Sequence, residues 1–300
     1  MPRFMAQIPW HYPNSLVDDA LQKWLCAPLE SEERGLQHLQ NAMRYAVLGD
    51  GKRTRPLLLL EAFHASGGQE SDIEIALFGA CAVELIHAYS LVHDDLPAMD
   101  NSPTRRGLAS VWAKYGDGMA TLAGDSLQTL AFESIAQTGN VRAITLLAQA
   151  AGTQGMAGGQ AIDIEWTNEG DGLHVSGERL LRLHALKTGA MIRASAEIGA
   201  VLSGCDEECV RKLREYGEHL GRAFQIWDDV LDVIGDPQIT GKGGVDAQND
   251  KITATSIWGL DGARHQALSA RDKALAALEN FGPKAQTLRE LANFVVNRDK

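Results

Sequence analysis

Two clusters of aspartates stand in otherwise apolar stretches of the sequence. They are Asp94, Asp95 and Asp100, and Asp228, Asp229 and Asp232. A single aspartate pair is usually a solvated helix end, but carboxylates among apolar residues lose hydration unless a cation compensates them. Mg²⁺ favours carboxylate oxygens together with substrate phosphates and water. The two clusters therefore predict a magnesium–diphosphate site held between two facing helices.

A diphosphate also needs positively charged partners, and the sequence offers three groups of them. They are Lys52, Arg53 and Arg55 within Gly51–Pro56, Arg105 and Arg106 just after the first cluster, and the isolated Lys187, Lys242 and Lys251. Pro56 suits the first turn of a helix, and a helix N-terminus adds amide donors for an anion. Taken alone, each of these cations is more simply explained as a surface residue than as a ligand of a diphosphate. For Lys251 the two explanations are equally balanced.

The elements that carry these residues are predicted to be helices. No proline lies between Pro103 and Pro237, and we find no period-2 pattern typical of strands. A capping box at residues 71–74 is expected to open a long helix that ends near His93, and a second long helix is expected to end at Ile234. The further predicted helices cover residues 17–25, 36–47, 55–65, 120–136, 141–161, 179–202, 263–280 and 287–297. The fold class is all-α.

Composition narrows the possible classes of function. The 300-residue chain has 39 acidic and 28 basic residues, a net charge of −11, which disfavours broad nucleic-acid binding. Four cysteines without a CxxC motif suggest neither a disulfide framework nor structural zinc. We see no signal peptide and no apolar run near the roughly 20 residues of a membrane span, so a cytoplasmic protein is expected. One domain over residues 1–300 is predicted, with residues 1–15 loosely ordered.

Other catalytic motifs fit poorly. His93-Asp94 matches the core of a helical phosphohydrolase motif, whose other ligands would be present only by chance. Residues 235–242 resemble a P-loop but have the wrong spacing and no preceding strand. We find no Ser–His–Asp or Cys–His arrangement.

The motifs resemble those of the trans-polyprenyl diphosphate synthase family from about residue 16 to the C-terminus. In order, they are GKRTRP, IHAYSLVHDDLPAMD, TRRG, AGDSLQTLAF, GGQAIDIE, HALKTGAMIRA and FQIWDDVLDVIGD. The resemblance implies an isoprenoid synthase-type bundle of ten or more helices around a central substrate cavity. It also implies Mg²⁺-assisted condensation of isopentenyl diphosphate with dimethylallyl or geranyl diphosphate, through an allylic carbocation.

The resemblance assigns roles to individual residues. Asp94, Asp100 and Asp228 would bind Mg²⁺, with three ions per site, and Asp95, Asp229 and Asp232 would support them. Arg105, Lys187 and Lys242 would bind the allylic diphosphate, and Lys52, Arg55, His87 and Arg106 would bind isopentenyl diphosphate. Thr188 and Gln225 would direct oxygen dipoles at the carbocation. A homodimer is expected, without nucleic acid and without membrane insertion.

Product length is expected to depend on Tyr89, five residues before the first aspartate, because bulk there limits chain growth in the family. An aromatic residue, together with the longer DDLPAMD motif, favours a C15 farnesyl product. A geranylgeranyl or geranyl synthase, or a non-catalytic partner subunit, are the alternatives. A class I terpene cyclase fits less well, because its second metal motif differs from DDVLD.

Several positions depart from the family pattern. Residues 101–103 lack the usual acidic groups, Trp227 replaces a commonly polar residue, and the segment after Lys251 differs from the usual motif. The tail at residues 297–300 resembles the basic end that helps to close the site in the family.

Overall fold

A computed structural model describes residues 8, 10–28, 33–49, 51–169, 175–234 and 252–298. The α-helices are α1 (Asn14–Leu25), α2 (Arg34–Val47), α3 (Thr54–Ala65), α4 (Ile73–Asp94), α5 (Val111–Tyr115), α6 (Asp117–Ala136), α7 (Val141–Ala151), α8 (Met156–Glu169), α9 (Gly177–His184), α10 (Ala190–Ser203), α11 (Glu207–Ile234), α14 (Ala254–Ala277) and α15 (Gln286–Val295). The shorter elements are the 3₁₀ turns η2 (Glu70–Asp72) and η5 (Pro283–Ala285), the π-helical turn η4 (Ala185–Gly189), and the strands β1 (Thr104–Arg105) and β2 (Leu108–Ala109). The predicted all-α class is confirmed.

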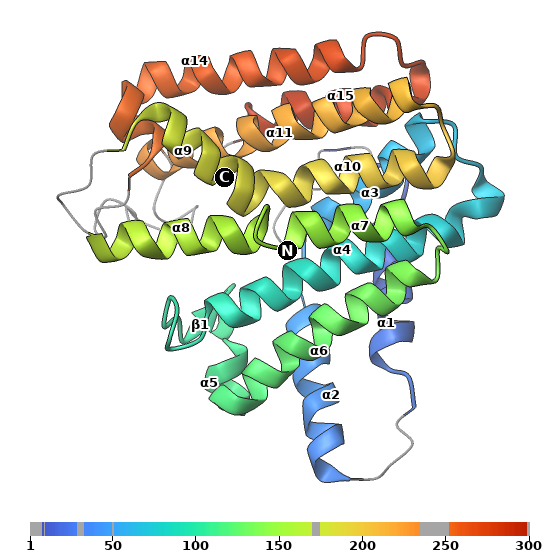
Figure 1. Ribbon diagram of the computed structural model, residues 1–300, viewed down its shortest axis with the longest axis vertical. Helices are drawn as coiled ribbons and strands as arrows, with labels where there is room; N and C mark the ends of the chain where they lie inside the picture. The colour runs from blue at the N-terminus through green and yellow to red at the C-terminus, as the bar shows by residue number, and fades with distance from the viewer. Residues whose placement is uncertain are drawn as a thin grey trace.

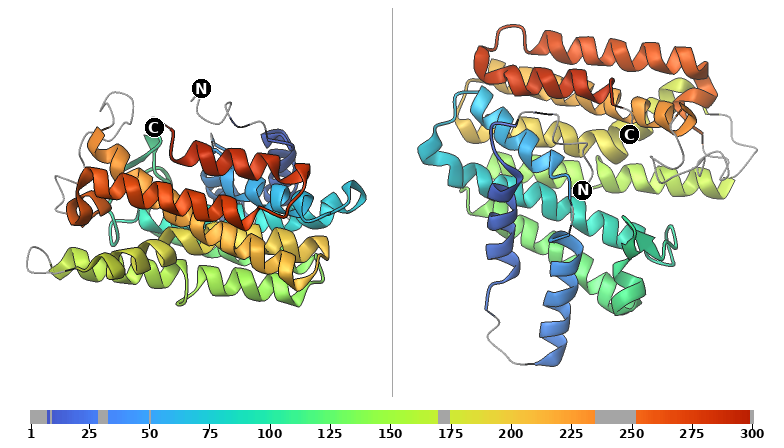
Figure 2. Two further views of the ribbon diagram at one scale, coloured as in Figure 1. Left: turned by 90° about the horizontal axis from the view of Figure 1, so that it is seen from above. Right: turned by 180° about the vertical axis from the view of Figure 1, so that it is seen from behind.

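The helices pack in two groups joined by α3 and α10. On one side α4 runs alongside α6, and on the other α11 runs alongside α14, with α10 and α3 between them (Figures 1 and 2). Helices α4 and α11 both have their C-terminal ends at the left of Figure 1. The residues at these ends are the two aspartate clusters, so the topology brings both clusters to one end of the bundle.

The core consists of two clusters of buried apolar side chains, and the same two helices contribute to both. Leu57 and Leu59 of α3 belong to the cluster with α4 and α6, whereas Leu58 belongs to the cluster with α11 and α14. Met191 and Ile192 of α10 divide in the same way. The single-domain prediction is supported by this sharing and stays a prediction.

Glycines allow the helices to cross closely. A Cβ on Gly199 of α10 would lie 2.2 Å from the carbonyl oxygen of Leu59, and one on Gly221 of α11 would lie 3.0 Å from the Cα of Gly189. The close contact explains why helical glycines, which cost about 1 kcal/mol each against alanine, are present.

Four expectations are corrected. The capping box is wrong: a 3₁₀ turn precedes α4, and Asp72 at its N-cap makes no side-chain cap hydrogen bond. The helix predicted over 141–161 is broken at 152–155 into α7 and α8. A two-residue hairpin is present where no strand was expected.

The expected lack of any apolar run near span length is the fourth correction. Residues Glu70–Asp94 contain an 18-residue window with a mean hydropathy of 1.8, apolar enough to cross a membrane. However, 67% of this window is buried inside the fold, as in the core helix of a globular protein.

Candidate active site

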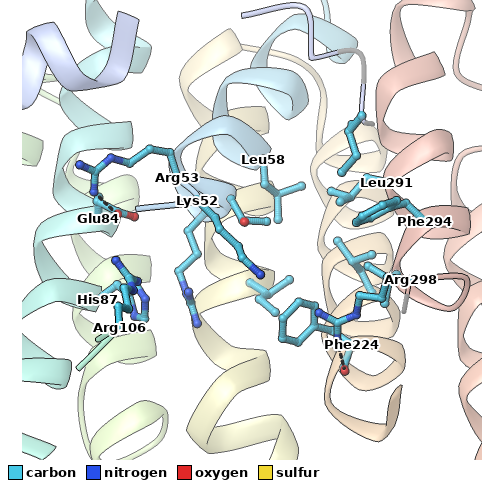
Figure 3. A pocket seen from close by; sticks show the side chains of 16 residues that line it. Lys52, Arg53, Leu58, Glu84, His87, Arg106, Phe224, Leu291, Phe294 and Arg298 are labelled. Atoms are coloured by element: carbon cyan, nitrogen blue, oxygen red, sulfur yellow. Dashed lines mark hydrogen bonds and ion pairs between the residues drawn. The ribbon is translucent and has the colours of Figure 1, made fainter. Parts of the chain in front are cut away.

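Two neighbouring cavities lie at the centre of the bundle, and Arg55 and His87 line both of them. The first has a volume of about 350 Å³ and is rich in cations (Figure 3). The second has a volume of about 400 Å³ and is lined by Tyr89, Asp94 and apolar residues of α8. The shared residues make the two cavities parts of one site.

The cation-rich cavity is built from residues distant in sequence. Lys52 and Arg106 line it from the side of α3 and α4, while Phe224 and Arg298 line it from the side of α11 and the C-terminal segment (Figure 3). The Nε of Arg55 is buried without a hydrogen-bond partner among the described residues. Since an unpaired buried donor is costly, this guanidinium is suited to an anionic ligand.

Arg53, the middle cation of the GKRTRP motif, has a structural role. Its Nε donates to Asp18 at 2.7 Å, its Nη1 to Glu84 at 2.8 Å, and its Nη2 to the carbonyl oxygen of Val47 at 2.7 Å. Its backbone has a φ of 49°, in the left-handed region, at the N-cap of α3. All three cations of the motif line the cavity, but the guanidinium of Arg53 is taken up by these hydrogen bonds and holds the loop.

His87 stands at the boundary between the two cavities. Burial, together with the neighbouring guanidinium groups of Arg55 and Arg106, holds the pKa of His87 well below its usual value. The imidazole is therefore neutral at physiological pH and able to offer one hydrogen bond to a ligand.

The first aspartate cluster is assembled by a loop at the end of α4. The backbone N–H of Asp100 donates to the carbonyl oxygen of Asp94 at 2.9 Å. The loop therefore folds back on itself and brings the backbone of Asp100 next to that of Asp94. Burial raises the pKa of Asp94 to about 6, with Lys187 lowering it and Asp100 raising it in turn. The carboxylates of Asp94, Asp95 and Asp100 together offer oxygen ligands, which Mg²⁺ prefers.

The buried Asp95 and the half-buried Arg105 form an ion pair beside this loop. The Nε and Nη2 of Arg105 each donate to one Asp95 oxygen at 2.7 Å, a bidentate arrangement. Arg105 is presented by the hairpin β1–β2, whose turn residues Arg106 and Gly107 both have positive φ, as a type I′ turn requires. Sequence periodicity could not detect strands this short.

Lys187 and Thr188 lie on the π-helical turn between α9 and α10 and line the second cavity. Single π turns within helices are frequent at functional sites. The Nζ of Lys187 donates to Asp163 of α8 at 2.6 Å. A Cβ on Gly159 would lie 2.3 Å from the backbone nitrogen of Lys187, so only glycine lets α8 approach this turn.

The second aspartate cluster is held by the C-terminal part of the chain. Asp228 accepts a hydrogen bond from Nη2 of Arg298. Asp229 is 5% exposed and accepts from the backbone N–H of Ala254 at 2.7 Å, at the N-terminus of α14. A carboxylate at that position stabilises the helix through its dipole, so Asp229 links α11 to α14.

Other predicted residues have different outcomes. Tyr89 is 8% exposed and lines the second cavity, edge-on to His93. Gln225 is half-buried on α11 and lines neither of the two cavities. Lys242 and Lys251 lie outside the described residues. Arg298 and Phe224 were missed as cavity residues; the basic tail was the available signal for Arg298.

Comparison with known proteins agrees with this geometry. Residues 36–291 match the model of the family described as Polyprenyl synthetase. Farnesyl diphosphate synthase of Escherichia coli is 40% identical over 86% of this chain and 88% of its own, and geranylgeranyl diphosphate synthase of Cyanophora paradoxa is 40% identical over 95% and 94%. An apo FPP/GFPP synthase from Zymomonas mobilis superposes with a TM-score of 0.80 at 36% identity, covering 97% of both chains. The chain belongs to the polyprenyl synthetase family.

Proposed function

We propose that this protein is a prenyltransferase that condenses isopentenyl diphosphate with dimethylallyl and geranyl diphosphate to give farnesyl diphosphate. The observation that carries the proposal is the pair of cavities joined at Arg55 and His87, one cationic and the other largely apolar and lined by Asp94 of the first aspartate cluster. Such a pair can hold two diphosphates with their hydrocarbon parts facing each other. Relatives named as farnesyl and geranylgeranyl diphosphate synthases support this assignment.

In the proposal, isopentenyl diphosphate binds in the cation-rich cavity. Lys52, Arg55 and Arg106 neutralise its diphosphate, and His87 donates a hydrogen bond as a neutral imidazole. The unpaired Nε of Arg55 supports this role, because an anionic oxygen would satisfy it. The five-carbon chain then extends toward the second cavity.

The allylic substrate occupies the second cavity with its diphosphate at the aspartates. Asp94, Asp100 and Asp228 would hold Mg²⁺, for which we propose three ions, as the family resemblance implies; their carboxylate oxygens fit this ion. When bound, Mg²⁺ neutralises the diphosphate leaving group and so favours its departure. Lys187 and Arg105 add positive charge from the protein, and Lys242 would add more from outside the described residues.

The chain's own residues then provide positioning and exclusion of water. The allylic C–O bond breaks, C4 of isopentenyl diphosphate forms a bond to C1 of the allylic cation, and a proton leaves C2 to the released diphosphate. Thr188 directs its hydroxyl dipole at the cation from the second cavity. Gln225 is proposed for the same role on the resemblance alone, since it lines neither cavity.

Tyr89 is proposed to form the floor that stops growth at C15. Its buried ring lines the second cavity, as does Ser90 beside it, and so occupies space that a longer chain would need. A geranylgeranyl synthase is the second candidate, because a relative with that name is 40% identical to this chain. A geranyl synthase is the third.

The deciding experiment incubates purified protein with Mg²⁺, isopentenyl diphosphate and each of dimethylallyl, geranyl and farnesyl diphosphate, and sizes the products. We expect C15 from the first two and little extension of the third. A C20 product from farnesyl diphosphate would favour the second candidate. No condensation with any acceptor would favour a non-catalytic partner subunit and overturn the proposal.

We also propose a cytoplasmic homodimer, as the family resemblance implies. Analytical ultracentrifugation tests the dimer, with a monomer at micromolar concentration as the contrary result. Cell fractionation tests the compartment, with activity in the membrane fraction as the contrary result.

A further inference from the structure

Two histidines and a glutamate converge outside the candidate active site, at the C-terminal end of α3. His11 comes from the N-terminal segment, His64 from the last turn of α3, and Glu70 from η2. The Nε2 of His11 lies 3.4 Å from Oε1 of Glu70, and the Nδ1 of His64 lies 4.0 Å from the same oxygen. All three donor atoms lie within 4.8 Å of one another.

These separations are close to those of a metal site. With bonds of about 2.0–2.2 Å to nitrogen and oxygen, two ligand atoms of a tetrahedral zinc ion are about 3.4 Å apart. The His11–Glu70 separation already has this value, and the His64–Glu70 separation needs to shrink by about 0.6 Å to reach it. The imidazole rings of His11 and His64 are stacked, with centroids 4.2 Å apart and planes 20° apart, so metal binding also requires a rotation that turns one nitrogen lone pair of each ring toward the same ion. The three protein ligands would leave a fourth position for water.

The donor groups are held in place by their neighbours. The hydroxyl of Tyr12 donates to Oε1 of Glu70 at 2.8 Å, and the backbone N–H of His11 donates to Oε1 of the buried Glu61 at 2.7 Å. Such outer hydrogen bonds orient metal ligands. The Tyr12 hydrogen bond lowers the pKa of Glu70, and burial lowers the pKa of His64, so both groups carry the protonation state that binds a cation.

The donor types select a different metal from the one proposed for the aspartates. Imidazole nitrogens suit zinc and its neighbours in the first transition row, whereas Mg²⁺ requires oxygen ligands. None of the three residues lines either cavity of the candidate active site. We propose that His11, His64 and Glu70 form a second metal site, for Zn²⁺ or a similar late first-row divalent ion, with water in the remaining coordination position.

The site would fasten the N-terminal segment to the body of the protein. Ile8, three residues before His11, is 4% exposed and lines the cation-rich cavity, and Trp10 packs against both core clusters. A metal bridging His11 to α3 and η2 would therefore hold part of the cavity wall. The site depends on geometry alone and not on the proposed prenyl transfer.

Calorimetric titration of the metal-free protein with ZnCl₂ tests the site. We expect His11→Gln and His64→Gln each to lower the affinity of one Zn²⁺ equivalent by at least about tenfold, while His265→Gln, on an exposed face of α14, leaves it unchanged. Saturating ZnCl₂ should raise the Tm of the wild-type protein by several degrees through mass action, with no rise in the two variants. MgCl₂, which the aspartates of the candidate active site are proposed to bind, should change the Tm of the wild-type protein and of both variants equally, because it does not use the histidines.

Hydrogen exchange and Co²⁺ spectroscopy locate the bound ion. Zn²⁺ should slow amide exchange in residues 10–13 and 61–72 of the wild-type protein only. Bound Co²⁺ should show no thiolate charge-transfer band, because Cys205, in the segment just before α11, and Cys209, in the first turn of α11, are not ligands in the proposal. Zn²⁺ affinity that survives in both histidine variants, or a thiolate band that disappears in Cys209→Ser, would overturn the proposal.

Discussion

Replacement of Arg298 is the most informative change to the candidate active site. Its guanidinium hydrogen-bonds to Asp228 and to the carbonyl oxygen of Phe224 at 3.2 Å, and stacks 4.2 Å from the Phe224 ring centroid. Nε1 of Trp227 donates to its carbonyl oxygen at 3.1 Å. The side chain is 4% exposed and lines the cation-rich cavity. One residue thus neutralises a proposed metal ligand and faces the proposed isopentenyl diphosphate.

Two opposite effects are expected for Arg298→Ala. Loss of a charged hydrogen bond to the diphosphate costs about 1.5–3 kcal/mol, which raises KM for isopentenyl diphosphate by about 10- to 150-fold. Loss of Arg298 also frees the Asp228 carboxylate, which favours Mg²⁺ binding. Because the Asp228 side chain is 38% exposed, solvent screening limits the interaction free energy of the Arg298–Asp228 pair to about 1 kcal/mol or less. The Mg²⁺ concentration at half-maximal activity should therefore fall by at most about fivefold.

Trp227→Phe separates these effects, because it removes the hydrogen bond to the tail and keeps every charge. A neutral hydrogen bond contributes about 0.5–1.5 kcal/mol, so KM for isopentenyl diphosphate should rise by only about 2- to 12-fold. Steady-state assays with isopentenyl diphosphate and Mg²⁺ varied independently measure both quantities, with Arg298→Lys as the variant that keeps the charge. If Arg298→Ala changes neither quantity, the tail has no part in the site.

Three further predictions concern the second cavity. Tyr89→Ala should shift the product from C15 toward C20, because burial of the five extra product carbons in the enlarged cavity contributes about 4 kcal/mol to binding. Tyr89→Phe, which keeps the ring, should still give C15. Unchanged product sizes in Tyr89→Ala would exclude Tyr89 as the floor. Gly159→Ala should lower kcat/KM by about 100-fold, because the new Cβ displaces the backbone of Lys187, whereas Gly118→Ala, with no heavy atom within 4 Å of its Cβ, should keep full activity. Equal activities of these two alanine variants would contradict the role of that contact. Asp94 must be ionised to bind Mg²⁺, and its pKa is raised to about 6, so half-saturating Mg²⁺ should increase about tenfold per unit as pH falls below about 6. The folded metal-free protein holds the Asp94 proton more tightly than the unfolded chain does, so the contribution of this carboxyl group to the free energy of unfolding falls as pH rises from about 4 to 6. A half-saturating Mg²⁺ concentration that stays constant over this range would show that Asp94 is not a ligand.

Residue types and spacing predicted the fold class, which the structure confirms, and the family to which the chain belongs. Two aspartate clusters in apolar surroundings indicated a divalent cation and a diphosphate, and the stretch without proline indicated consecutive helices. These signals are local: a helix depends on residues within a few turns, and a cluster of like charges is visible in the chain itself. The end of α4 at Asp94 and the start of α3 before Pro56 followed from the same local rules.

Tertiary structure decided which charged groups face the site. Arg53 and Arg55 look equivalent in the sequence and both line the cation-rich cavity, yet the Arg53 guanidinium is held by Asp18 and Glu84 while the Nε of Arg55 is buried without a hydrogen-bond partner among the described residues. Arg105, next to Arg106 in the sequence, is paired with Asp95 and does not line that cavity. The π turn at Lys187 and the hairpin of Thr104–Arg105 and Leu108–Ala109 left no signal in the sequence, and the basic tail indicated Arg298 without its partner Asp228.

Long-range contacts explain this division. Arg53 meets Glu84 across 31 positions, and Arg298 meets Asp228 across 70. A charged side chain is committed to a partner only when folding brings that partner near and removes water from both. Local sequence therefore determined which chemistry this protein can support, and packing of distant helices determined which residues are available to perform it.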